Sequence, residues 1–175
     1  MPKLKDFAVE LKIPFTDIGI EGTWTPDNDE RLAAWELYVE LITRIAVVDL
    51  KTDEGLVREA MASLHSLFDT TRKILRDHGP GVAKPKGRGN QSFGTIAVAV
   101  LNTVIRPFLA RWHPLLTDWE AGRRPNVSVT KHEAAWKHNA KVRKELQEVQ
   151  GALGEYADLL ARVAGVPALK RQRRK

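Results

Sequence analysis

The sequence predicts an all-α fold, a four-helix bundle of up-down-up-down topology with a short N-terminal β arm or hairpin. Long segments repeat apolar residues at helical spacing, glycine and proline mark their ends, and residues 3–24 alternate apolar and polar side chains as strands do. A length of 175 residues and a hydrophobic content of 43% suit one domain with its own core. We therefore expect a single domain over residues 1–169, followed by a basic disordered tail at 170–175.

The N-terminal arm and the first helix follow directly from local patterns. Phe7, Val9 and Leu11 alternate with polar neighbours, and a second alternating run ends at Trp24. Two strands alone are marginally stable, so the arm must pack on the helices or pair with another chain. Thr25 is the predicted cap of the first helix, which we expect to continue to about residue 50.

The second helix has a clear start and a clear stop in the sequence. Thr52 or Asp53 is the predicted cap, and Gly79 followed by Pro80 is the predicted end. The apolar residues between them recur every three or four positions, which indicates one buried face.

A third helix is predicted from Ser92 to about Arg111, and it is apolar on nearly all sides. Pro107 should kink or end it. Asn102 interrupts its apolar surface, so we expect a buried amide that fixes helix register or faces a pocket. A short helix is predicted over residues 114–122 of the following link.

Thr130 and Glu133 form a predicted capping box for the fourth helix, which should end near Gly165. Its apolar residues alternate at spacings of three and four, as in a coiled coil: Val142, Leu146, Val149, Leu153, Tyr156, Leu160 and Val163. Gly151 and Gly154 would let another backbone approach closely, either within one subunit or from a partner.

The basic charge is concentrated in two segments that look flexible. The net charge is +6, yet the loop 84–94 and the tail 170–175 together contribute eight positive charges, so the rest of the chain is near neutral. The loop's glycines precede a helix, where backbone N–H groups attract anions, but the known nucleotide-binding loops follow a strand and this loop follows a helix. It is therefore either a polyanion-binding loop or a connector. The expected polyanion-binding residues are Lys84, Lys86, Arg88, Lys170, Arg171, Arg173, Arg174 and Lys175.

The composition also argues against several classes of protein. There is no cysteine, which removes disulfides, thiol catalysis and cysteine-ligated zinc and suits a cytoplasmic protein. No apolar run is long enough to predict a membrane span. We expect no metal and no cofactor, because His132 and His138 lie on different helix faces and no Glu-x-x-His pair is present.

Two Arg–His spacings are the candidates for catalysis. Arg72 precedes His78 by six positions, and Arg106 precedes His113 by seven in 106-RPFLARWH-113. This spacing in a helical chain resembles the HEPN-type ribonucleases. That resemblance implies an arginine that stabilises a phosphate and a histidine that acts as general acid or base. The family favours a polar residue directly after the arginine, and Pro107 departs from this pattern.

Absence of a polar catalytic cluster leads to the main functional expectation, a non-enzymatic adaptor or accessory protein. It would act through protein contacts, as a homo-oligomer or inside a larger complex, with Trp24, Trp119, Gly151 and Gly154 as partner-binding residues. The alternative is a nucleic-acid-binding protein that uses the basic loop and tail, with a ribonuclease as a variant of it.

Overall fold

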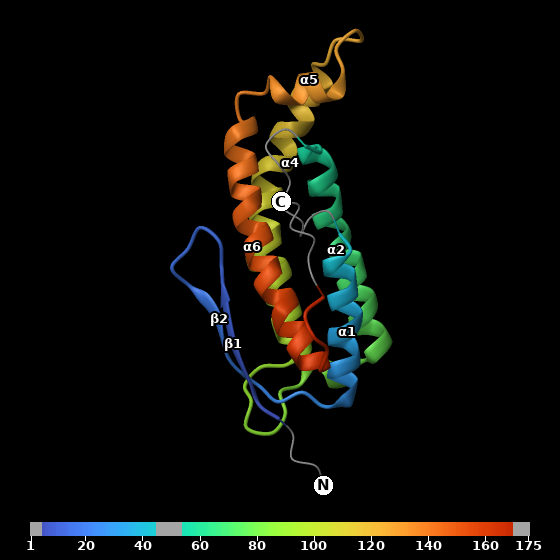
Figure 1. Cartoon of the computed structure of the whole chain (residues 1–175), viewed down its shortest axis with the longest axis vertical. Helices are drawn as coiled ribbons and strands as arrows, with labels where there is room; N and C mark the ends of the chain where they lie inside the picture. The colour runs from blue at the N-terminus through green and yellow to red at the C-terminus, as the bar shows by residue number, and fades with distance from the viewer. Residues whose placement is uncertain (1–4, 45–53, 170–175) are drawn as a thin grey trace.

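The computed structural model describes residues 5–44 and 54–169, and it shows a mostly helical chain with one two-stranded antiparallel sheet (Figure 1). In chain order the elements are β1 (Phe7–Lys12), β2 (Gly19–Trp24), α1 (Asn28–Ile42), α2 (Val57–His78), the 3-10 helix η2 (Pro80–Ala83), α3 (Phe93–Val100), the π-helix η3 (Leu101–Ile105), α4 (Arg106–Ala121), α5 (Val129–Ala134) and α6 (Asn139–Ala164). The long helices run along the long axis of the molecule, α5 lies at one end, and the hairpin lies beside α6 toward the other. α6 contacts α1, α4 and β1, and α1 also contacts α2.

The predicted hairpin is confirmed, and it pairs within the chain. β1 and β2 are antiparallel, with Phe7 opposite Trp24 and Leu11 opposite Ile20. The side chains of these four residues are buried, because one face of the hairpin packs against the helices. The turn between the strands includes Phe15, a bulky residue at φ 65° whose side chain is half exposed.

Asp27, not Thr25, caps α1. The Asp27 carboxylate accepts from the Glu30 N–H, and the Glu30 side chain accepts from the Asp27 N–H, which completes a capping box. The Thr25 hydroxyl instead donates to Asp6 Oδ1 at 2.8 Å. α1 ends at Ile42, earlier than predicted. The predicted cap at residues 52 and 53 lies outside the described residues.

Glu30 joins four segments of the chain at one buried carboxylate, which is fully shielded from solvent. Its Oε1 accepts from the Trp24 indole N–H at 3.0 Å and from the Phe93 N–H at 2.9 Å. Its Oε2 accepts from Lys86 Nζ at 2.9 Å and from the Asp27 N–H at 3.2 Å. Buried charge is tolerated when it is paired and hydrogen-bonded in this way. The hairpin, α1, the basic loop and α3 therefore meet at Glu30.

The second helix ends as predicted, because Gly79 adopts φ 73° and terminates α2 before Pro80. The third predicted helix is longer than expected. Ser92 caps it, but Pro107 does not end it, and α3, η3 and α4 form one continuous run to Ala121 that contains the predicted short helix.

The apolar run Phe93–Ala121 has the length and composition of a membrane-spanning helix, and its most apolar window has a mean hydropathy of 1.6. More than half of its most apolar window is buried inside the chain, as in the core helix of a soluble protein.

The fourth predicted helix is divided into two. Ser128, not Thr130, caps the short α5, and α6 begins only at Asn139. Glu133 does not form the predicted box but is buried, where it accepts from the Val57 N–H at 3.0 Å and pairs with Arg143. The seven residues of the predicted seam on α6 are all buried.

Candidate functional site

A pocket of about 340 Å³ lies between α2 and α4. Its polar side chains are His65 and Arg72 from α2 and Arg106 and His113 from α4. The remaining lining residues are Phe68, Leu109, Ala110 and Pro114. The described lining thus combines two guanidinium groups and two imidazoles with an apolar floor and contains no carboxylate, which is a composition that attracts anions.

Phe68 organises the cationic groups of this pocket. Its ring is 7% exposed, and the guanidinium carbons of Arg106 and Arg72 lie 4.9 and 5.7 Å from its centre. The His65 ring lies beside it at 6.2 Å. Both guanidinium groups therefore lie over one aromatic ring, where cation–π attraction holds them at the pocket.

The two arginines differ in whether a carboxylate neutralises their charge. Arg72 donates to Asp69 Oδ1 at 2.8 Å on the exposed surface of α2. Arg106 donates to the neutral Asn102 Oδ1 at 3.1 Å and has no carboxylate partner among the described residues. Asn102 is exposed, so the prediction that it is buried is wrong, and its role is to hold the Arg106 side chain. Arg106 therefore carries the least compensated charge in the pocket.

The π-helix η3 determines where Arg106 lies. Pro107 has no N–H, and its ring would collide with the Thr103 carbonyl in a regular helix. The chain accommodates it with one wider turn, in which the Arg106 N–H donates to Leu101 O, five residues back. α4 then continues without a break, so Arg106 and His113 lie about two turns apart on one face.

Pro114, which lines the pocket, leaves one carbonyl of α4 without its usual donor. It lies inside α4 and cannot donate an N–H to the Ala110 carbonyl, and both residues line the pocket. The Ala110 carbonyl therefore lacks the N–H donor that the residue four positions on supplies elsewhere in a helix.

One of the two predicted Arg–His pairs is brought together and the other is not. Arg106 and His113 share the pocket, whereas His78 lies outside it and its Nε2 pairs with Glu36 at 3.0 Å. Arg72, from the second pair, joins the pocket from α2. His65 was not predicted as a site residue, although His65, Phe68 and Arg72 have the i, i+3, i+7 spacing of one helix face.

The basic loop 84–94 is packed against the chain and is not the flexible segment expected. Lys86 pairs with Asp27 and Glu30, both at 2.9 Å, so its charge is neutralised. Burial alone would lower the pKa of Lys86, but hydrogen bonds to these carboxylates raise it above 10.5. A Cβ on Gly89 would lie 2.7 Å from the Thr23 carbonyl, which shows how closely the loop approaches β2. Lys84 and Arg88 are exposed, and the tail 170–175 lies outside the described residues.

The predicted partner-binding residues are scattered. Trp24 is completely buried and binds Glu30, so it anchors the hairpin inside the chain and is not available to a partner. Trp119 is half-buried and stacks on His132 at 4.6 Å. Gly151 is exposed with open space around it, and Gly154 is buried.

The second histidine of the 132–138 stretch is separate from the first. His138 lies beside Trp112 and Trp136 in a different aromatic cluster from that of His132. Within the described residues, no group of three or more His, Asp or Glu side chains is placed to hold a metal ion.

No protein-family model, curated protein or solved structure matches this chain.

Proposed function

We propose that the chain is a helical-bundle protein of the cytoplasm that binds single-stranded RNA at the pocket between α2 and α4. The observation that carries the proposal is the pair of guanidinium groups of Arg72 and Arg106, both held over Phe68, beside two imidazoles and without a lining carboxylate. Arginine forks match the geometry of phosphate oxygens and form strong, charge-assisted hydrogen bonds to them.

RNA suits the pocket better than a simple inorganic anion. The Ala110 carbonyl lacks its helical donor. A ligand with a hydroxyl beside a phosphate would donate to this carbonyl while its phosphate accepts from the arginines. A ribose 2′-hydroxyl beside a phosphodiester has these two groups. The exposed Lys84 and Arg88 and the basic tail would add contacts that depend on salt but not on sequence.

The test is fluorescence anisotropy with a labelled oligouridylate of about 12 nucleotides, a length that suits short single-strand sites. Arg106→Ala should weaken binding roughly tenfold or more, because a hydrogen bond to a charged group contributes about 1.5–3 kcal/mol. The control is Arg111→Ala, which removes another exposed arginine of the same helix whose partner is Glu145, outside the pocket. Absence of binding at about 50 mM salt, or equal losses in the two variants, would contradict the proposal.

The geometry of the site supports RNA binding without RNA cleavage. No described residue forms a hydrogen bond to a ring nitrogen of His65 or His113, whereas a catalytic imidazole is normally oriented by such a partner. The HEPN-like alternative predicts metal-independent cleavage of the RNA that is lost in both Arg106→Ala and His113→Ala. Electrophoresis of the labelled RNA after incubation with EDTA distinguishes these outcomes.

A second candidate function is that of an adaptor that binds a protein through the hairpin. At the hairpin turn, Phe15 and Ile18 expose 50% and 67% of their surfaces, which is unusual for large apolar residues so close together. If the partner is another copy of the chain, light scattering coupled to size exclusion should show a dimer. A monomer at all concentrations would remove self-association.

A further inference from the structure

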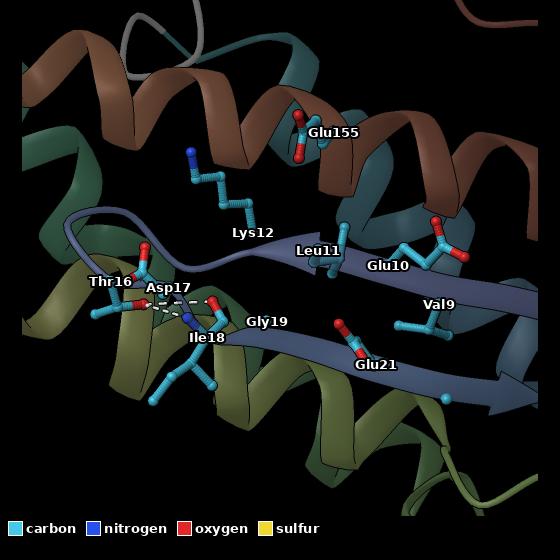
Figure 2. A pocket seen from close by; sticks show the side chains of 11 residues that line it. Val9, Glu10, Leu11, Lys12, Thr16, Asp17, Ile18, Gly19, Glu21 and Glu155 are labelled. Carbon is cyan, nitrogen blue, oxygen red and sulfur yellow. Dashed lines mark hydrogen bonds between the residues drawn. The ribbon is translucent and has the colours of Figure 1, made fainter.

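A groove of about 640 Å³ runs along the hairpin on the side of α6 (Figure 2). It is lined by residues 9–12 of β1, by the turn at 16–18, by parts of β2, and by Glu155 of α6. In Figure 2, β1 is the strand nearer α6, and Glu155 lies on the wall opposite it. The groove shares no residue with the pocket between α2 and α4.

The charge of the groove is strongly acidic and is not compensated. Its carboxylates are Glu10, Asp17, Glu21 and Glu155, and none of them has an ion-pair partner among the described residues. Lys12 is the one lining cation. Glu10 and Glu21 lie directly opposite each other across the strands, an arrangement of like charges that destabilises an isolated hairpin. A positively charged ligand would relieve this repulsion.

The outer edge of β2 is partly covered. Both backbone groups of Thr23 point away from β1: its carbonyl accepts from the Asn90 and Gln91 N–H groups, and its N–H donates to Asn90 Oδ1. Opposite residues of an antiparallel pair point their backbone groups the same way, inward or outward. Ala8, which faces Thr23, therefore also points its N–H and carbonyl outward.

The outer edge of β1 faces α6 across the groove, and its backbone groups are unpaired. By alternation from Ala8, Glu10 and Lys12 also direct their backbone groups outward. None of these groups has a hydrogen-bond partner in the described part of the chain. A row of unpaired N–H and carbonyl groups is a template for another strand.

We propose that this groove binds an extended, lysine- and arginine-rich peptide segment of a partner protein, which pairs with β1 as a third strand. The unpaired backbone groups of β1 supply the hydrogen bonds, and the four carboxylates select a basic sequence. A second copy of the hairpin fits less well, because it would bring the same carboxylates against each other. The inference rests on the adaptor function and is independent of RNA binding.

The test is anisotropy of a fluorescent Val-Lys-Val-Arg-Val-Lys-Val peptide with the full-length protein, compared with a Val-Glu-Val-Glu-Val-Glu-Val peptide. We expect the basic peptide to bind and the acidic peptide not to bind. Glu10→Pro removes an outward N–H that the fold itself does not use, and proline is tolerated at such edge positions. This variant should weaken binding at least tenfold, whereas Glu10→Gln, which keeps the N–H, should weaken it only a few-fold.

Amide hydrogen exchange on the wild-type protein tests the proposal even if Glu10→Pro does not fold. In the wild-type protein, the basic peptide should slow exchange at Ala8, Glu10 and Lys12. No binding at low salt, full binding by a folded Glu10→Pro, or unchanged exchange at these amides would overturn the proposal. A dimer in light scattering that Glu10→Pro converts to a monomer would overturn it in favour of a second copy. The adaptor function could survive either result through the Phe15 and Ile18 surface, which an Ile18→Ser variant probes separately.

Discussion

Replacing Glu30 with alanine should destabilise the chain more than any exposed substitution in α1. The change removes the acceptor of the Trp24 indole and the Phe93 N–H, two donors in fully buried residues. Each donor left without an acceptor costs about 1–3 kcal/mol. Lys86 keeps Asp27 but loses its buried partner. We expect a loss of about 3–5 kcal/mol, the usual result of breaking a buried ion pair from one side.

For a chain of this size, 1 kcal/mol corresponds to a shift of about 2–4 °C in Tm, so Glu30→Ala should lower Tm by roughly 6–20 °C. The assay is thermal unfolding followed by circular dichroism. Glu30→Gln keeps an acceptor for both buried donors, so its Tm should lie between those of the wild type and Glu30→Ala. Glu36→Ala, on the exposed surface of the same helix, should shift Tm little, since the Glu36 carboxylate is about half exposed. Equal Tm values for Glu30→Ala and Glu36→Ala would refute the reasoning.

Two further predictions concern the same region. Gly89→Ala should cost about 1–3 kcal/mol of stability through overpacking, because its Cβ would press on backbone atoms of β2, whereas Gly81→Ala has open space and should be neutral; urea unfolding measures both. Burial alone would raise the pKa of Asp27, but hydrogen bonds from the Glu30 N–H and Lys86 lower it below 3.8. The ionised carboxylate therefore stabilises the fold fully above pH 3.8, and this stabilisation is lost as the pH falls through the lower pKa of the folded state. The Tm difference between wild type and Asp27→Asn should therefore shrink toward zero in that acidic range, and a difference that persists at the lowest pH would contradict this assignment.

The elements with a strong period could be predicted from the sequence. The alternation around Val9 indicates the hairpin, and the three-and-four spacing from Val142 indicates the buried face of α6, because these patterns record which side of each element meets the core. The caps could not be predicted as well. Thr25 and Asp27 both offer a side-chain oxygen, and only the position of Asp6 shows why the threonine is used elsewhere.

The candidate site could be predicted only in part. The Arg106–His113 spacing was visible, because both lie on one helix. The contributions of His65 and Arg72 depend on the packing of α2 against α4, which no local pattern records. The neutralisation of Lys86 likewise depends on Glu30, which lies 56 positions away in the sequence.

The wider turn at η3 has a consequence beyond the placement of Arg106. A π-turn is equivalent to one residue inserted into an α-helix, and such an insertion rotates everything after it by about 100° while leaving the preceding turns in place. The turn thus sets how the pocket face of α4 is rotated about the helix axis relative to the core face of α3. Deleting a single residue within Leu101–Ile105 would remove this rotation and turn Arg106 and His113 together away from α2. The pocket can therefore be gained or lost by a one-codon change that leaves the preceding core helix intact.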